Sequence, residues 1–175
     1  GVHSVNDLTK FVPGLEQPQL ANHSRLSLRG VSSGDNQSFE QSVGTYVDGV
    51  YRGRMNQLRS GFFDMERVEV LKGPQVSLYG NSSVGGALSM ATKRPEVGDE
   101  LNGNFTVKYE TEYEESQILG GVNIPVTDEF AVRVAGKWRD QSGGAAFNHY
   151  TGKVENSYED SAFRISAVWE PNDEL

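Results

Sequence analysis

The stretch of the chain that decides its fold runs from residue 67 to residue 95 and has the sequence Arg67-Val-Glu-Val-Leu-Lys-Gly-Pro-Gln-Val-Ser-Leu-Tyr-Gly-Asn-Ser-Ser-Val-Gly-Gly-Ala-Leu-Ser-Met-Ala-Thr-Lys-Arg-Pro95. Residues 68–71 predict a short apolar strand, and Gly73-Pro74 predicts its end. The glycines that follow, Gly80, Gly85 and Gly86, allow backbone conformations that residues with a Cβ resist. Residues 87–92 predict a second extended run. The predicted order is therefore strand, tight turn, glycine-rich loop and second strand.

This segment resembles the closing part of the plug domain of TonB-dependent outer-membrane receptors. Other parts of the plug pattern precede it in the order that the family has. Residues 5–15 resemble the early helix with its Pro-Gly stop, and Leu28-Arg29-Gly30 resembles the end of a plug strand. Residues 45–50 resemble the hairpin with its Asp-Gly turn. The resemblance covers about residues 4–95, and the remainder resembles the first barrel strands of the same proteins.

The first half of the chain predicts a small α+β domain. Ser4 is expected to cap a short helix through Phe11, which turns Leu8 and Phe11 toward the core. Asp48-Gly49 is a strong turn signal after an extended run. Arg29 and Arg67 are expected at strand positions. Half-buried or apolar strands are predicted at four places: residues 26–29, 43–47, 66–71 and 86–92.

Charge is distributed unevenly along the chain, whose formal net charge is −8. Residues 1–96 carry a net charge of +1 and residues 97–175 a net charge of −9. This shift predicts a domain boundary near Pro95, with the plug at 1–96 and the first four barrel strands at 97–175. The charge also argues against nucleic-acid binding. Because the chain has no cysteine, it has no disulfide framework and no thiolate metal site.

From Asn104 onward, four runs alternate between apolar and polar side chains. One predicted face includes Phe105, Val107, Tyr109, Thr111, Tyr113, Ile118, Val122, Ile124, Phe130, Val132, Val134, Trp138, Phe163, Ile165, Ala167 and Trp169. The other face carries full charges, which are Lys108, Glu110, Glu112, Arg133, Lys137 and Arg139. A soluble β-sandwich also alternates. The charged face, the aromatic residues near strand ends and the alternation of short and long connections favour antiparallel strands of a transmembrane β-barrel.

Four strands cannot close into a barrel, because lipid cannot satisfy the hydrogen-bonding groups of open edges. Barrels of outer-membrane transporters have about 22 strands around a plugged lumen. The chain is therefore expected to hold an incomplete barrel. It begins at Gly1 without a Met or a leader segment, and we interpret it as truncated or processed.

Three polar stretches, residues 17–24, 32–41 and 52–62, are candidates for the ligand site. From the residues alone they are solvated surface loops. The resemblance implies that loops at these places form the apices of the plug and touch the ligand. The candidate ligand-binding residues are His23, Asp35, Asn36, Gln37, Phe39, Arg52, Arg54 and Asn56. The arginines among them suit an anionic ligand, because a guanidinium pairs bidentately with a carboxylate.

Two further arginines, Arg29 and Arg67, have two interpretations. One is a partly buried guanidinium that donates to backbone carbonyls. The other, implied by the resemblance, is a contact between plug and barrel.

The resemblance implies a TonB-dependent active transport receptor in the outer membrane of a Gram-negative bacterium. Its ligand would be scarce, a ferric siderophore first among the candidates, with cobalamin, haem, oligosaccharides and nickel complexes still open. Its partners would be TonB, through a box missing from this chain, and outer-membrane lipid. No cofactor and no metal site are expected. A non-transporting ligand-binding or adhesion protein, or a signalling receptor with an additional N-terminal domain, remains the alternative.

One sequence motif suggests an enzyme. Gly30-Val-Ser-Ser-Gly34 fits the G-x-S-x-G pattern with Ser32 as nucleophile. That motif needs a helix after the serine, whereas polar loop residues follow here. We therefore expect no enzymatic activity.

Overall fold

The computed structural model describes residues 5–17, 19–20, 23–24, 26–33, 41–53, 62–80, 83–98, 100–112, 114–142, 146–155 and 158–171. The chain divides into two compact units, residues 1–93 and 94–175. The predicted assignment of 1–96 to a plug and 97–175 to barrel strands remains a prediction. In the described ranges, no helix is long and apolar enough to span a membrane.

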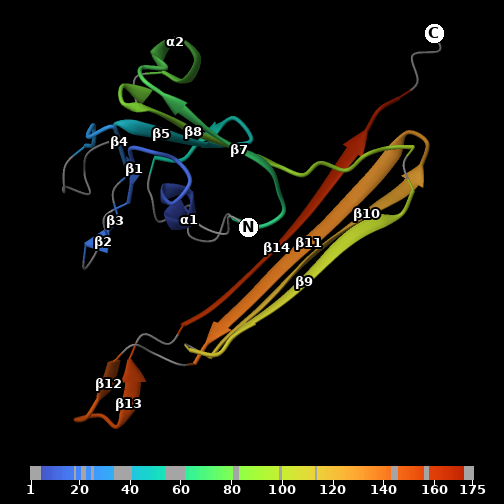
Figure 1. Ribbon diagram of the computed structural model, residues 1–175. Helices are drawn as coiled ribbons and strands as arrows, with labels where there is room; N and C mark the ends of the chain where they lie inside the picture. Colours follow the sequence, from blue (N-terminus) through green and yellow to red (C-terminus); the bar gives the residue numbers. More distant parts are fainter. Residues whose placement is uncertain are drawn as a thin grey trace. The chain divides into compact units, whose positions relative to one another are not determined.

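The first unit is an α+β domain built around a four-stranded sheet (Figure 1). Its elements are α1 (Val5–Thr9), β1 (Leu15–Glu16), β2 (Gln19–Leu20), β3 (His23–Ser24), β4 (Ser27–Leu28), β5 (Val43–Val47), β6 (Val50–Tyr51), β7 (Met65–Lys72), α2 (Val76–Tyr79) and β8 (Gly86–Thr92). The sheet has the order β6-β5-β8-β7. Strands β5 and β8 pair in parallel, whereas β6 and β7 pair antiparallel with their neighbours. Strands β1 and β4, and β2 and β3, form small antiparallel pairs.

One apolar cluster forms the core of this unit. Its buried members are Val5, Leu8, Leu15, Leu26, Leu28, Val43, Phe62, Leu88 and Met90. Helix α1 contributes Val5 and Leu8, which share a face because they are three residues apart. The prediction that Phe11 also faces the core is wrong, since Phe11 is 69% exposed. The helix ends at Thr9, the amides of Phe11 and Val12 both donate to the carbonyl of Leu8, and Val12 packs against the cluster instead.

Strand β5 is buried on both faces. Val43 and Thr45 have no exposed surface, and Tyr46 on the other face is 5% exposed. The predicted half-buried strand is therefore wrong at this place. The reason is that both faces are covered: Val43 packs into the apolar cluster on one side, and on the other Tyr46 contacts Tyr79 and Ser83 of the loop between β7 and β8.

Two tight turns each contain two successive residues with positive φ angles. The sequence predicts a turn at only one of these two places. Asp48 and Gly49 connect β5 to β6 with φ angles of 50° and 78°. Arg29 and Gly30 have φ angles of 53° and 79° between Leu28 and Val31, which bond to each other through both amides. Two successive positive φ angles are typical of type I′ turns. Arg29 therefore lies in a turn, and its predicted strand position is wrong.

The second unit is an antiparallel meander of four long strands. They are β9 (Asn102–Glu110), β10 (Glu115–Thr127), β11 (Phe130–Gln141) and β14 (Tyr158–Trp169), in the order β14-β11-β10-β9. The sequence predicts a short turn at residues 125–129, but β10 continues to Thr127, and only Asp128 and Glu129 form the turn that joins it to β11. Thr111, predicted in the first strand, lies in a turn after Glu110, and Tyr113 lies outside the described residues.

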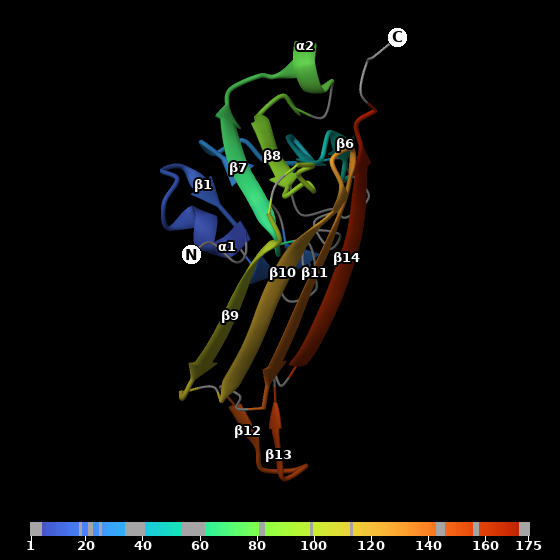
Figure 2. The same cartoon turned by 90° about the vertical axis from the view of Figure 1, so that its right-hand side faces the viewer.

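The long connection from β11 to β14 contains a hairpin that the sequence analysis missed. Its strands are β12 (Ala146–Asn148) and β13 (Lys153–Glu155), and the hairpin projects from one end of the meander (Figure 2). The strands are only three residues long. Such short runs leave too little periodicity to distinguish them from a polar loop.

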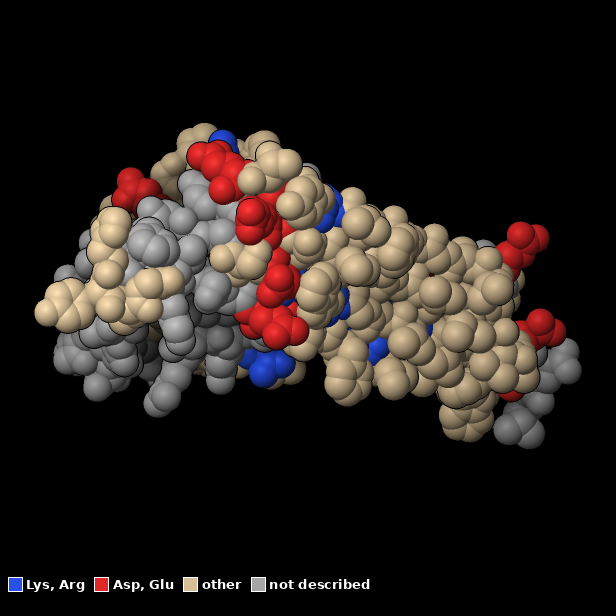
Figure 3. All heavy atoms as spheres, turned by 90° about the horizontal axis from the view of Figure 1, so that it is seen from below, with Lys and Arg blue, Asp and Glu red and all other residues tan. Residues whose placement is uncertain are grey.

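The apolar face of the meander is the exposed one. Its large side chains include Phe105, Val107, Tyr109, Ile118, Val122, Ile124, Val134, Trp138, Phe163, Ile165 and Trp169, all of them more than a third exposed. The opposite face is more buried, with Ala131, Arg133 and Ala135 at 0%, 5% and 3%. In Figure 3 a broad, mostly uncharged surface has acidic side chains at its borders. A soluble sandwich would cover this apolar face with a second layer, whereas barrel strands turn it toward lipid.

Candidate functional site

The loop between β7 and β8 is held on the sheet by Tyr46. The Tyr46 hydroxyl donates to the carbonyl oxygen of Tyr79 and lies 3.1 Å from Oγ of Ser83. The rings of Tyr46 and Tyr79 have centroids 4.6 Å apart. The amide of Gln75 donates to the carbonyl of Ser83 over 2.9 Å and closes the loop. The sequence analysis missed this role, although an aromatic residue between Thr45 and Val47 was the available signal.

Gly86 allows β7 and β8 to approach each other at the start of β8. Its φ angle is 139°, which residues with a Cβ rarely adopt. A Cβ at this position would lie 2.5 Å from the carbonyl oxygen of Leu71 and 2.6 Å from Cδ2 of Leu28. The predicted use of glycine for an unusual backbone conformation is therefore confirmed at Gly86 and at Gly80, whose φ is 79°, whereas Gly85 has no positive φ angle.

Asp48 does more than form a turn. Its carboxylate accepts two hydrogen bonds from Thr92, one from the amide at 2.8 Å and one from the hydroxyl at 2.9 Å. Its amide donates to Met90 over 2.9 Å, and the amide of Lys93 donates to the carbonyl of Asp64 over 3.0 Å. Asp48 thereby fixes the end of β8, where the first unit ends.

Two of the eight predicted ligand-binding residues lie in the described part of the chain. His23 belongs to β3, where it pairs with Leu20. Arg52 follows β6 directly, is half-buried, and donates its amide to the carbonyl of Thr45 over 2.7 Å. Arg52 therefore lies at the end of the β5–β6 hairpin, whose turn contains Asp48. The other six residues lie outside the described residues: Asp35, Asn36, Gln37, Phe39, Arg54 and Asn56.

Arg29 and Arg67, the predicted plug–barrel contacts, are both exposed. Arg67 lies in β7 as predicted, with Nε 2.9 Å from Glu69 and Nη1 3.3 Å from Glu66. Both carboxylates are also largely exposed, so these ion pairs are weak. The interpretation of Arg29 and Arg67 as partly buried guanidiniums is therefore wrong. Their contact with a barrel remains a prediction.

Ion pairs and hydrogen bonds connect the four long strands on the face opposite the apolar one. Arg139 of β11 binds Glu115 of β10 through two contacts, of 2.7 and 2.6 Å. Lys137 of β11 lies 2.5 Å from Asp160 of β14. Such bidentate or close pairs join neighbouring strands and keep the charged groups paired.

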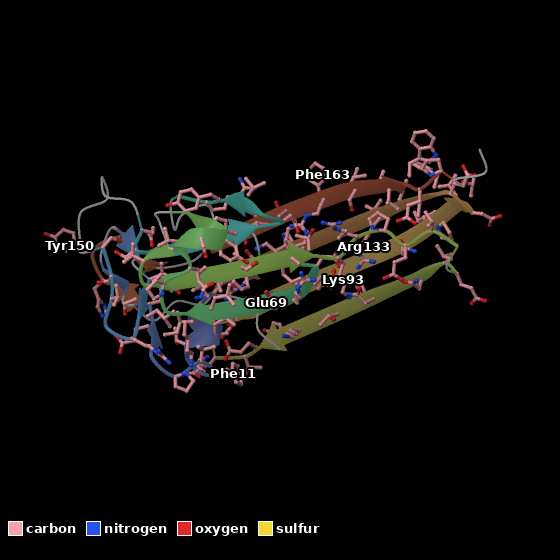
Figure 4. All side chains as sticks on the ribbon, turned by 90° about the horizontal axis from the view of Figure 1, so that it is seen from above. Phe11, Glu69, Lys93, Arg133, Tyr150 and Phe163 are labelled. Carbon is pink, nitrogen blue, oxygen red and sulfur yellow. The ribbon has the colours of Figure 1, made fainter. Side chains whose placement is uncertain are left out.

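Arg133, labelled in Figure 4, extends this network to the first strand. Its Nη2 donates to Oδ1 of Asn104 in β9 over 3.3 Å. Polar contacts therefore link all four long strands on this face, which suits the polar interior of a barrel.

Asn123 holds the segment that precedes β9. Its Oδ1 accepts from the amide of Glu96 at 3.1 Å, and its Nδ2 donates to the carbonyl of Glu96 at 3.2 Å. Asn123 is 2% exposed, and its side-chain amide bonds to the backbone N–H and C=O of Glu96 as the backbone of a paired strand would. This pair explains why residues just after Lys93 belong to the second unit.

The residues that the structure describes include no group of three or more histidine, aspartate or glutamate side chains placed to hold a metal ion. The fold and this geometry together define a class of protein. An α+β domain is followed by an antiparallel meander with a lipid-compatible outer face and a charged inner face, which is the arrangement of a plugged outer-membrane β-barrel receptor.

Comparison with known families identifies the chain within that class. Residues 1–87 match the family model of the TonB-dependent receptor plug domain. The chain therefore belongs to the TonB-dependent receptors, and the predicted location in the outer membrane is confirmed.

Three relatives show how far the similarity extends. The pesticin receptor of Yersinia enterocolitica is 38% identical over 98 residues, which are 55% of this chain and 14% of that receptor. The ferrioxamine receptor of Yersinia enterocolitica is 28% identical over 177 residues, which cover 98% of this chain and 23% of that protein. The crystal structure of the ferric yersiniabactin uptake receptor of Yersinia pestis superposes with a TM-score of 0.84 and 28% identity, covering 99% of this chain and 27% of that one. The chain thus spans between 14% and 27% of the length of these relatives.

Proposed function

We propose that this chain is the plug and first barrel strands of a receptor that actively transports a scarce ligand across the outer membrane. The observation that carries the proposal is the direct succession of the two units. A plug-type fold ends at β8, and within ten residues the chain enters strands whose apolar face is exposed and whose other face is charged. A non-transporting adhesion protein needs binding loops and a membrane anchor, but it does not need a separate domain of this fold before the first barrel strand.

A ferric siderophore is the ligand class that we propose. The support is the names of the relatives, which include a ferrioxamine receptor, a ferric enterobactin receptor and a ferric yersiniabactin uptake receptor. The predicted apices agree with this class, because arginines pair well with the anionic groups of iron chelates. In this scheme, the ligand binds the apices and TonB supplies the driving force for uptake. No catalytic step is involved.

Uptake by the complete receptor tests this function. A strain without other siderophore receptors would express it and receive iron-55 bound to ferrioxamine B, enterobactin or yersiniabactin. We expect uptake of one of these chelates, and we expect that uptake to disappear in a matched strain without TonB. Radiolabelled cobalamin serves as a ligand of another class.

The outcomes separate the alternatives. Binding to the cell surface without TonB-dependent uptake would favour the non-transporting receptor. Uptake of cobalamin without uptake of any iron chelate would keep the transport function and contradict the ligand class.

A further inference from the structure

The apolar outer face of the meander is interrupted by a row of glycines. The register of the four strands places one residue of each in a single row across the sheet, which is Phe105, Gly120, Gly136 and Phe163. Two aromatic rings therefore stand at the sides, and two residues without side chains lie between them. Phe163 is 82% exposed and Phe105 is 72% exposed, so both rings rise above the surface. Figure 4 shows Phe163 projecting away from its strand.

Larger side chains lie on both sides of the two glycines along the strand direction. Ile118 pairs with Trp138 on one side of the glycines, and Val122 pairs with Val134 on the other. These side chains line a depression of about 650 Å³ together with the two phenylalanines. We call it the glycine notch. The notch is a shallow depression that is open along the sheet, so it suits a chain lying on the surface rather than an enclosed ligand.

The notch lies inside an uncharged belt of the outer face. The nearest charged side chains of that face are Asp140 and Glu159, which face each other at the end of β11 and β14. They stand four residues from the glycine row, which is about 14 Å along the strand at 3.4 Å per residue. The indole nitrogen of Trp138 donates to Glu159 over 3.1 Å. Tryptophan with its polar end toward the charged border is typical of the membrane interface.

We propose that the glycine notch is a binding site for one acyl chain of a bilayer lipid. At this depth the notch is surrounded by hydrocarbon, because the row lies close to the middle of β10, β11 and β14. An empty notch would leave its walls without van der Waals partners. A flexible alkyl chain fills an irregular apolar depression without a matched shape, and the two phenylalanine rings confine it from the sides.

A second copy of the chain is a weaker occupant. Between proteins in a bilayer there is no hydrophobic driving force, because lipid tails are as apolar as the surfaces that they would leave. Association would require a close fit of one surface to another. A lipid chain is present at high concentration and needs no such fit.

The two glycines differ in what a side chain would meet, which supplies the test. A Cβ on Gly136 would approach only the carbonyl oxygen of Ala162, at 3.7 Å. A Cβ on Gly120 would lie 3.2 Å from the ring of Phe105. Gly136→Leu should therefore fill the notch without a backbone clash. Ala167→Leu is the matched control, since Ala167 is exposed on the same face and does not line the notch.

The experiment measures lipid that stays on the complete receptor. Wild type, Gly136→Leu and Ala167→Leu would be reconstituted in vesicles of phosphatidylethanolamine and phosphatidylglycerol, extracted into detergent and analysed by native mass spectrometry. We expect wild type and Ala167→Leu to retain one phospholipid. Gly136→Leu should lower the retained fraction about tenfold, which corresponds to about 1.4 kcal/mol of binding free energy. The heat-dependent gel shift of folded barrels confirms that each variant has assembled.

A second variant keeps the proposal testable if Gly136→Leu fails to fold. Phe163→Ala removes one wall of the notch without adding volume, and it should also lower lipid retention. Quenching of Trp138 by lipids with brominated chains, taken as the difference from Trp138→Phe, should fall in both variants.

Three results would overturn the proposal. The first is equal lipid retention in wild type, Gly136→Leu and Phe163→Ala. The second is an equal loss in Ala167→Leu, which would indicate general lipid contact. The third is a wild-type dimer that Gly136→Leu converts to monomers, because the notch would then hold a second copy.

Discussion

Val134→Arg tests which face of the meander meets lipid. Val134 lies in β11, is 41% exposed, and forms a row with Val122 and Ile165 on the outer face. Strand β11 has 12 residues, about 40 Å at 3.4 Å per residue. Val134 is the fifth of them, so it lies close to the middle of a tilted membrane-spanning strand.

The expected cost follows from that depth. An arginine on the lipid face costs about 2–4 kcal/mol at the midplane and close to zero near the interfaces. Thr106→Arg is the control, because Thr106 is half-buried on the opposite, charged face of β9. We expect it to cost less than about 1 kcal/mol, as most substitutions at polar, partly exposed sites do. Ala135, the neighbour of Val134, is unsuitable as a control because it is only 3% exposed.

Equilibrium unfolding in urea, with the complete receptor folded into lipid vesicles, measures both costs. The difference between the free energies of unfolding of the two variants should be about 2 kcal/mol or more. Equal losses for Val134→Arg and Thr106→Arg would refute the reasoning, since an arginine on the proposed lipid face would then cost no more than one on the charged face.

Three further predictions concern the polar contacts. Asp48→Ala should destabilise the first unit by about 1–2 kcal/mol through the loss of two hydrogen bonds, and hydrogen exchange at Thr92 should accelerate; unchanged exchange would contradict this role. Asn123→Leu leaves two backbone groups of the segment before β9 without their partner, so limited proteolysis of that segment should become faster, with Asn123→Asp as a milder change. Replacing Arg52 and Arg54 together by Ala should weaken binding of an anionic ferric siderophore more than of a neutral one with unchanged surface expression; equal affinities would remove both residues from the site.

Local chemistry along the sequence by itself determined several elements of this protein. Residues 86–92 form a strand and Asp48-Gly49 a tight turn, because glycine and alternation act within a few residues. The exposed apolar face of residues 105–169 was predictable for the same reason, since side chains of a strand alternate with a period of two. For the ligand site the sequence offers only polar loops, and of the eight candidate residues in them the structure describes Arg52 and the backbone of His23. Polar composition indicates exposure but does not indicate which loops converge.

Tertiary structure alone decided the contacts between segments distant in sequence. Tyr46 holds the carbonyl of Tyr79, 33 residues away, and Asp48 holds Thr92, 44 residues away. Burial of both faces of β5 follows from the apolar cluster on one side and the loop between β7 and β8 on the other, which alternation within β5 does not reveal. The glycine notch exists because the register aligns Gly120 with Gly136. A shift of the register by one residue would put them on opposite faces. Periodicity along one strand therefore predicts which side chains share a face. Which strands pair, and in what register, depends on the interactions of all strands of the sheet together.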